Sequence, residues 1–305
     1  NLTALLGQNI NTQDYQRLTA ASSGLAIPGY YNVSNGQNFS NTDEFKRQKR
    51  LLGFYSQLSF AYKNYLFLEL TGRVDKSSTL PSSNNTYFYP SVSGGFVFTD
   101  AFNLKTDVFS YGKIRAAYAR VGKDADPYSL DSRTYGPASY GNNVGLFNFP
   151  YGSVVGFGPT GRIGNPGLKP ELTYAYEFGL NLGFFKDRLT MEATVYNQGS
   201  NNQIINIGIA PSSGYTSMVN NIGEISNKGI ELLVSAIAVK TKNLTWNISG
   251  NFSKNKNKVI SLAPGINSFT IPGNNFAAVI PSAVVGLPYG VILGNKQPRS
   301  PDGQL

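Results

Sequence analysis

Residues 171–184 read ELTYAYEFGLNLGF and residues 189–196 read LTMEATVY, and these two stretches decide the fold. Every second residue from Tyr174 to Phe184 is apolar, and the residues between them are small or polar. The second stretch alternates in the same way, from Leu189 to Val195 on one face. Side chains on a β-strand point alternately to opposite faces, so each stretch predicts a strand with one apolar and one polar face. Lys186-Asp187 lies between them and predicts a hairpin.

The same alternation recurs along most of the chain. It predicts further strands at residues 2–6, 54–62, 66–73, 91–98, 114–119, 230–235 and 244–252. Several of these strands run about ten residues, against about 5–6 in an ordinary soluble sheet. Ten tilted strand residues are long enough to cross the hydrocarbon core of a bilayer.

The connections alternate between short and long. Residues 63–64, 185–188 and 238–243 are short connections, 99–111 is intermediate, and 77–87, 121–172 and 197–228 are long. Antiparallel strands place successive connections at opposite ends, so the short ones share one end and the long ones the other. Outer-membrane barrels combine short periplasmic turns with long external loops. The sequence therefore predicts an all-β fold, a portion of a transmembrane antiparallel β-barrel.

Two other β architectures also produce alternation. A soluble β-sandwich alternates because one face of each sheet packs a core, and a surface adhesin or fibre is a third possibility. Aromatic residues favour the barrel, because Tyr62 and Tyr65 flank one tight turn and Phe184 and Phe185 another, as at a lipid–water interface. The apolar stretch 277–294 contains Pro281 and Pro288, which break a helix, so a strand flanked by loops is expected there.

The composition excludes several classes of catalytic and metal site. The chain has 305 residues, 19 Tyr and 19 Phe, only 14% charged residues, and neither Cys nor His. A Ser-His-Asp triad, a thiol nucleophile and a zinc site with thiolate or imidazole ligands are therefore excluded. The chain has a net charge of +9, and two basic clusters lie beside predicted strands, at 46–50 and at Lys254, Lys256 and Lys258. That placement suits anionic lipid headgroups better than nucleic acid, for which no fold signature is present.

Five short motifs, in order along the chain, carry a family resemblance. They are Arg73-Val74-Asp75-Lys76-Ser77-Ser78, Tyr89-Pro90-Ser91-Val92-Ser93-Gly94-Gly95-Phe96, Lys113-Ile114-Arg115-Ala116-Ala117-Tyr118, Asn165-Pro166-Gly167-Leu168-Lys169-Pro170-Glu171 and Asn227-Lys228-Gly229-Ile230-Glu231. Together they resemble the barrel of TonB-dependent outer-membrane receptors of the SusC/RagA branch. Lys76 and Phe96 depart from the residues that are common there.

This resemblance implies a transporter rather than an enzyme. It places residues 1–305 inside one C-terminal barrel domain of 22 strands, with the plug domain, the TonB box and the final closing strands outside the chain. The chain itself would supply about nine or ten strands, from the number of alternating runs. The implied activity is TonB-dependent import of a large nutrient, a glycan or an oligopeptide, without a cofactor. The implied partners are a SusD-like surface lipoprotein, the TonB–ExbB–ExbD complex and outer-membrane lipid.

The longest predicted loop is rich in aromatic and amide side chains. These candidate ligand or partner contacts are Tyr128, Tyr135, Tyr140, Asn142, Asn143, Phe147, Phe149 and Tyr151. Rings stack on sugars or peptides, and amides bond to hydroxyls and backbone, so the loop is a candidate binding site. Packing of the loop on itself explains the same residues equally well.

Three further patterns are weak. Residues 156–161 match G-x-G-x-x-G, but the two prolines that follow do not fit the helix of a dinucleotide site. Asp124 and Asp126 begin a calcium-loop pattern that Tyr128 and Tyr135 do not continue, so a single loop-bound calcium is a minor alternative. The hairpin register places Glu177 near Tyr196 and Asn181 near Glu192, which does not bring two carboxylates together for glycosidase chemistry.

Overall fold

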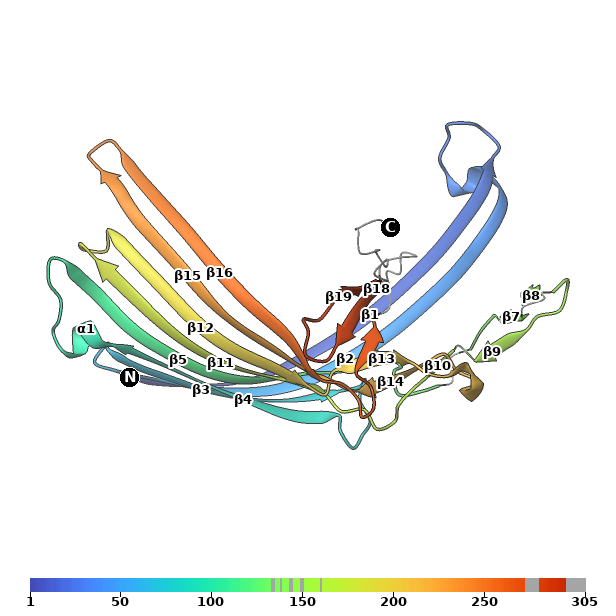
Figure 1. Ribbon diagram of the computed structural model, residues 1–305, viewed down its shortest axis with the longest axis horizontal. Coiled ribbons are helices and arrows are strands. Elements are labelled where there is room, and N and C mark those ends of the chain that lie inside the picture. The colour runs from blue at the N-terminus through green and yellow to red at the C-terminus, as the bar shows by residue number, and fades with distance from the viewer. Residues whose placement is uncertain are drawn as a thin grey trace, which may run out of the picture.

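The structure is a computed structural model that describes residues 1–132, 135–137, 139–142, 145–148, 151–159, 161–271 and 280–294. Within these residues, nine strands form one antiparallel sheet whose spatial order follows the chain, and the sheet bends into a curved wall (Figure 1). Its strands are β1 (Leu2–Leu25), β2 (Gly36–Tyr62), β3 (Leu66–Ser77), β4 (Thr86–Val97), β5 (Phe109–Lys123), β11 (Glu171–Phe184), β12 (Leu189–Asn201), β15 (Glu224–Lys240) and β16 (Thr245–Ser261). The predicted all-β antiparallel architecture is confirmed.

The register of the deciding hairpin is the predicted one. Glu177 faces Tyr196 and Asn181 faces Glu192 across β11 and β12. The tight turn between these strands holds Phe185, Lys186 and Asp187 at positive φ of 56°, 60° and 61°. Few side chains adopt that left-handed region, so the pairing on both sides, rather than a glycine, fixes the turn.

The ends of the wall differ as the connection lengths predict. The turns at 63–65, 185–188 and 241–244 lie at one end, together with the short helix α1 (Phe98–Ala101). The other end carries long connections with small elements of their own (Figure 1). These are η1 (Val33–Asn35), β6 (Tyr135–Pro137), β7 (Ser139–Asn142), β8 (Gly145–Asn148), β9 (Phe157–Pro159), β10 (Arg162–Ile163), β13 (Ile204–Gly208), η2 (Pro211–Ser213), β14 (Ser217–Asn221), β17 (Ser268–Thr270), β18 (Ile280–Val284) and β19 (Val291–Leu293).

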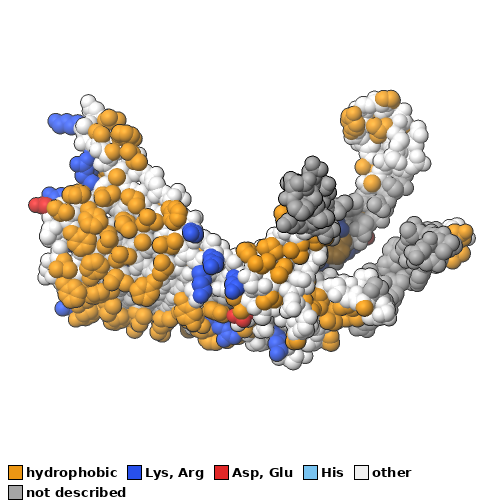
Figure 2. Space-filling view, in the orientation of Figure 1, with side chains coloured by type: hydrophobic (Ala, Val, Ile, Leu, Met, Phe, Trp, Pro, Cys, Tyr) orange, Lys and Arg blue, Asp and Glu red, His pale blue; other side chains and the backbone are white. Residues whose placement is uncertain are grey.

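The outer face of the wall is apolar and uncovered. Phe178 is 59% exposed, Phe252 57% and Val195 51%, and Figure 2 shows such side chains gathered over the outside of the curve. In the described part of the chain, no second sheet packs against this face. A soluble sandwich would bury these residues in a core, so the surface suits lipid instead. No helix among the described residues is long and apolar enough to cross a membrane.

Aromatic rings form a chain along the tight-turn end. The ring contacts are Tyr62–Tyr65 at 5.7 Å, Tyr65–Phe96 at 6.1 Å, Phe96–Phe102 at 5.8 Å, Phe98–Phe109 at 6.1 Å and Phe109–Phe184 at 5.4 Å between centroids. A second group, Tyr118, Tyr174 and Tyr176, lies on the outer face toward the loops. From Phe184 to Tyr174, a strand tilted by roughly 40° rises about 25 Å, the height of a barrel's apolar band.

Two strands are much longer than the alternation predicts. The expected strands at 2–6 and 54–62 are only the tight-turn ends of β1 and β2, which pair as far as Leu25 and Gly36. Residues 8–17 and 44–50 are mainly polar on both faces, so period two is lost while the backbone ladder continues. The strand expected through Phe98 instead ends at Val97, and α1 begins at Phe98. In 280–294 the expected strand is two short strands, β18 and β19.

Candidate functional site

The inner face of the wall holds a polar hollow of about 440 Å³ across β5, β11, β12, β15 and β16. Its lining is Arg115, Glu177, Thr194, Tyr196, Gln198, Asn227, Glu231 and Asn255. Alternation produces it, because the same strands that send apolar residues outward send these side chains inward. The hollow is lined by hydroxyls, amides and charges rather than by apolar groups, which suits a wet interior.

Arg115 lines this hollow and is held against the wall by two hydrogen bonds. Its Nε donates to Asn181 Oδ1 at 3.1 Å, and its terminal nitrogen donates to Thr194 Oγ1 at 2.5 Å. Gly179 makes this possible, since a Cβ there would lie 2.3 Å from Arg115 Nε. A side chain at position 179 would therefore lift the guanidinium away from the wall.

Three carboxylates on the inner face are exposed. Glu177, Glu192 and Glu231 form no ion pair with any residue that the structure describes. Glu177 and Glu192 are not cross-strand partners, as the sequence predicted. The arrangement offers charged acceptors for a cationic or hydrogen-bonding group in the interior.

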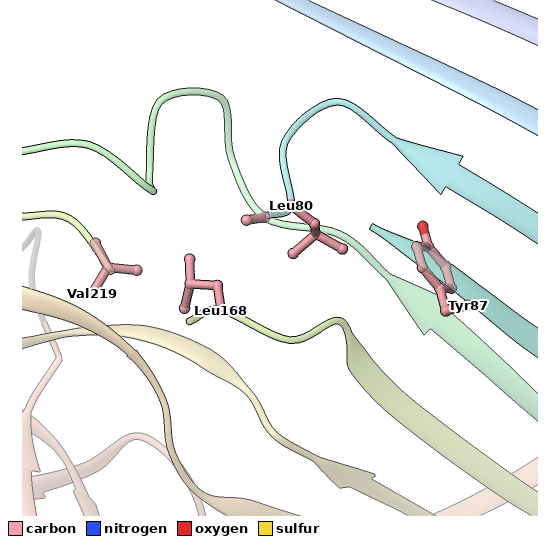
Figure 3. Packing of buried hydrophobic residues seen from close by; sticks show 5 residues of the cluster. Leu80, Tyr87, Leu168 and Val219 are labelled. Carbon is pink, nitrogen blue, oxygen red and sulfur yellow. The ribbon is translucent and has the colours of Figure 1, made fainter. Parts of the chain in front are cut away.

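Long loops meet in a dry core at the base of the loop end. Leu80, Tyr87, Ala125, Leu168 and Val219 pack there, each less than 9% exposed (Figure 3). They come from the connection between β3 and β4, from β4 itself, from both ends of the connection between β5 and β11, and from β14. Burying apolar side chains from separate loops stabilises the loops against one another and against the wall.

Leu168 shows what the motif from Asn165 to Glu171 does. It is fully buried, and its carbonyl accepts a hydrogen bond from Asn84 Nδ2 at 3.1 Å. The Lys169 amide donates to Asn221 Oδ1 at 2.7 Å, and Asn221 Nδ2 returns a bond to the Lys169 carbonyl at 2.8 Å. Asn165 Nδ2 donates to Asn220 Oδ1 at 3.1 Å. The motif, which includes Pro166 and Pro170, therefore fastens three loops together.

Glu171 adds a further contact between the loops and the wall. Its carboxylate accepts from the Ile204 amide at 2.9 Å and lies 3.3 Å from Lys123 Nζ. Asn165, Leu168, Lys169 and Glu171 thus each have a structural partner within the chain.

Two buried carboxylates hold the loop ends of β2, β3 and β5. Asp75 is 3% exposed and accepts from Arg73 Nε at 2.8 Å and from the Tyr89 hydroxyl. Asp124 is 9% exposed and accepts from Lys49 Nζ and from Ser77 Oγ, each at 2.5 Å. Charged hydrogen bonds of this kind are stronger than neutral ones. Each carboxylate is neutralised by a cation.

This pairing argues against calcium at Asp124. Lys49 and Ser77 already take both of its oxygens, and the described residues contain no cluster of three or more acidic side chains that would hold a metal. The predicted calcium alternative has no support in the geometry. The G-x-G-x-x-G stretch is followed by the short strand β10 rather than by a helix, so a dinucleotide site is not formed there.

The remaining family-motif residues lie along the sheet. Ser78 Oγ accepts from the Arg50 amide at 2.9 Å, and Asn227 Oδ1 accepts from Asn257 Nδ2 at 2.8 Å. Ser91 shares a hydroxyl hydrogen bond with Thr71, and Pro90 faces Gly72 across the ladder. The positions that the resemblance singled out are Arg73, Asp75, Ser77, Ser78, Pro90, Ser91, Asn165, Pro166, Leu168, Lys169, Pro170, Glu171, Asn227, Lys228, Gly229 and Glu231.

The candidate loop contacts are only partly brought together. The β7–β8 hairpin places Tyr140 opposite Phe147, and Asn142 lies at its turn. Tyr135 is on β6, whereas Asn143 and Phe149 lie outside the described residues. Tyr128 lies farther back, where its hydroxyl accepts from the Gln48 amide at 3.3 Å, and Tyr151 is 62% exposed. A binding role for this set stays a prediction.

Sequence reasoning did not find the loop core or the Asp124 pair. Leu80, Ala125 and Val219 lie far apart in the chain and follow no period. The available signal was a single apolar residue, Leu168, enclosed by two prolines in a polar loop. In this chain the apolar residue between the two prolines packs in the loop core and does not contact solvent.

The comparisons with known proteins agree on one family. A family model described as TonB dependent receptor-like, beta-barrel matches residues 1–294. TonB-dependent receptor P26 of Formosa agariphila is 29% identical over 268 residues, which cover 86% of this chain and 26% of that protein. TonB-dependent receptor SusC of Bacteroides thetaiotaomicron is 26% identical over 226 residues, which cover 73% and 22%. The chain thus spans about a quarter of the length of the curated relatives it matches.

Solved structures show the same fold. The RagAB peptide transporter matches with a TM-score of 0.76 at 23% identity, over 94% of this chain and 30% of that chain. The copper transporter OprC matches with a TM-score of 0.52 at 15% identity, over 86% and 36%. At such identities the likeness concerns the backbone fold and leaves the cargo open.

Proposed function

The chain belongs to the TonB-dependent receptor β-barrel family, and from that membership we propose that it forms part of the wall of a channel that imports a large nutrient. Barrels of this family lie in the bacterial outer membrane, which agrees with the predicted location. The family consists of transporters rather than enzymes, in agreement with the sequence-based prediction.

The observation that carries the proposal is the difference between the two faces of the wall. Phe178 and Val195 are more than half exposed on the outer face, while the hollow around Arg115 on the inner face is lined by polar groups. A lipid-facing exterior and a hydrophilic interior are what a channel through an apolar membrane needs. The same wall also supports long loops at one end, where a ligand would first arrive.

The domain arrangement is part of the proposal. Residues 1–305 form an internal portion of one barrel domain, and a plug domain, a TonB box and closing strands belong to other parts of the receptor. The relatives, about four times as long as the matched segment, support this arrangement. A plug inside the barrel would give cationic partners to the inner carboxylates, Glu177 and Glu231 among them, which form no ion pair within the described wall.

The cargo class follows from the chemistry of the interior. Asn227, Asn255 and Thr194 offer neutral hydrogen-bonding groups, which suit glycan hydroxyls or peptide amides. Among the proteins named above, RagAB is a peptide transporter by its description. We therefore propose a glycan or an oligopeptide as cargo, a SusD-like surface lipoprotein as the lid, and the TonB–ExbB–ExbD complex as the energy source.

A strain that lacks the receptor gene tests this function. Uptake of fluorescent oligosaccharides and of fluorescent oligopeptides is measured in the parent, the deletion strain, the complemented strain and a strain without TonB. We expect one cargo class to be lost in both deletions and restored by complementation. Unchanged uptake of both classes, together with reduced surface attachment, would instead support a structural or adhesive β-protein.

The lid is tested separately. A tagged receptor is purified from outer membranes in mild detergent, and the copurifying proteins are identified. We expect a stoichiometric surface lipoprotein. Recovery of the receptor without one, from cells that import the nutrient, would remove the lid from the proposal while leaving the channel in place.

A further inference from the structure

The inner face of the wall has a second hollow, of about 420 Å³, centred on β3, β4 and β5. One cross-strand row crosses its floor: Ser59 on β2, Glu69 on β3, Ser93 on β4, Ala117 on β5 and Glu177 on β11. Serine and alanine are short, so few side-chain atoms project into the lumen from this part of the wall. Glu177 also lines the polar hollow described above, and the two hollows therefore adjoin.

This second hollow lies at mid-height of the spanning wall. Gly179 lines it and stands midway along β11 between Tyr174 and Phe184, the aromatic residues at the two ends of the apolar band. Every molecule that passes through the barrel must cross this level. The space that the wall leaves free here therefore bears directly on passage.

Two long cations of β5 line the second hollow, and each lies over a glycine of a neighbouring strand. Arg115 extends across Gly179 toward β12, to which it donates a hydrogen bond. Lys113 extends in the opposite direction across β4, where a Cβ at Gly95 would lie 2.8 Å from Lys113 Cε. Its Nζ ends 5.7 Å from the centroid of the Phe67 ring on β3. The two side chains thus follow the wall on either side of β5 and leave the lumen clear.

The backbone does not require glycine at these two positions. Neither Gly95 nor Gly179 has a positive φ, and each lies inside a paired strand. Glycine in a strand interior weakens the strand, because it has no side chain to pack and loses more entropy on folding. What glycine offers here is the absence of a Cβ, which is the space that the cations of β5 occupy.

We propose that the hollow over β3, β4 and β5 is the passage along which the cargo crosses the membrane. Gly95 and Gly179 are positioning residues that keep it open, since they let the two cations of β5 lie against the wall. The hydroxyl, carboxylate and guanidinium groups of its lining suit a chain of hydroxyl- or amide-bearing units. The plug then contacts the carboxylates of β12 and β15 rather than this part of the wall. The inference rests on the proposed import function and adds where in the lumen the cargo passes.

The test is a double-mutant cycle in the intact receptor, measured by uptake of the fluorescent cargo that the parent strain imports. Gly179→Ala places a Cβ 2.3 Å from Arg115 Nε, and the guanidinium then moves toward the lumen because the sheet lies beneath it. We expect a severalfold loss of uptake. In an Arg115→Ala background, which has no long side chain to displace, Gly179→Ala should change uptake no further. Gly95→Ala is tested in the same way, with and without Lys113→Ala.

A matched control lies on the outer face of the same hairpin. Gly199 is the cross-strand partner of Tyr174, and a Cβ at position 199 would lie 2.3 Å from Tyr174 Cζ. Gly199→Ala displaces that ring toward lipid and should leave uptake at the parental rate. Receptor abundance in the outer membrane and heat-modifiable migration on gels confirm that each variant is folded.

Three results would overturn the passage. Parental uptake by both glycine variants would show that the displaced cations obstruct nothing. An equal loss with and without Arg115 would show that Gly179 acts through the sheet itself. Entry of vancomycin, which the intact outer membrane excludes, into cells with the Gly179→Ala receptor would show that the plug occupies this hollow and was displaced. A parent strain that imports neither fluorescent cargo would remove the proposed function together with the passage, whereas a failed cycle in an importing strain removes the passage alone.

Discussion

The two ends of the same strands are held in different ways. Toward the tight turns, Tyr62, Leu66 and Trp246 leave 40–55% of their surface exposed. Toward the loops, Leu168 and Val219 are buried by other parts of the chain. The first end depends on lipid to cover its apolar groups, and the second builds a small protein core of its own.

This difference explains which part of the structure the sequence could predict. Lipid covers one face of a strand continuously, so the spanning end carries a strict period of two, and the β11–β12 register followed from it. The loop core collects residues from separate connections, such as Leu80 and Val219, and has no period. In the parts of β1 and β2 farther from the tight turns, at residues 8–17 and 44–50, both faces are mainly polar. The alternation therefore disappears there, although the strands stay paired.

The largest effect is expected in the loop core. Leu168→Ala removes a fully buried side chain, and such changes typically cost about 2–5 kcal/mol. We expect the connections around residues 78–85 and 161–170 to open while the spanning strands stay paired. Hydrogen exchange of these segments in the purified receptor measures the opening. Val155→Ala, at a 71% exposed position, is the control. Equal protection in the two variants would show that Leu168 does not hold these connections together.

The next effect concerns lipid at the spanning end. Leu180→Arg puts a charge on the outer face and should cost about 2–4 kcal/mol of barrel stability near mid-membrane. Leu233→Arg is the matched control, because Leu233 lies on the inner face opposite Glu192. We expect the first variant to lose heat-modifiable folded receptor in urea titrations in liposomes and the second to keep it. Similar losses would show that the faces are assigned incorrectly.

A smaller effect tests the buried ion pair at the boundary between the two ends. Asp124→Asn removes the charge that Lys49 contacts, and a hydrogen bond to a charged group is worth about 1.5–3 kcal/mol. Asp126→Asn, two residues away and exposed, should change stability by less than about 0.5 kcal/mol. Proteolysis of the 121–132 segment under native conditions reports the local opening. If both variants are cleaved at the parental rate, the Lys49–Asp124 contact does not hold this segment.

The smallest effect on stability, and the largest on function, is expected in the longest loop. Pro137 and Phe157 are cross-strand partners in the β6–β9 pair, so a two-residue Asn-Gly turn can replace residues 138–156 and close the hairpin. The described elements among the removed residues, β7 and β8, form a sheet of their own outside the nine-stranded wall, and the barrel should therefore stay in the membrane. Long irregular loops on rigid scaffolds commonly carry binding sites. We expect nutrient uptake or lid association to fall.

A second variant separates the chemistry of this loop from its length. Replacing Tyr140 and Phe147, which are backbone register partners in the β7–β8 hairpin, by Ser keeps the loop and removes two rings. If ring stacking on sugar or peptide contributes to binding, this variant should reduce uptake without changing receptor abundance. Uptake of the fluorescent cargo and copurification of the lid are measured for both variants. If the shortened receptor inserts normally, imports at the parental rate and retains its lid, these residues only pack or decorate the loop. A defect confined to the shortened receptor would assign the role to the length of the loop rather than to its aromatic side chains.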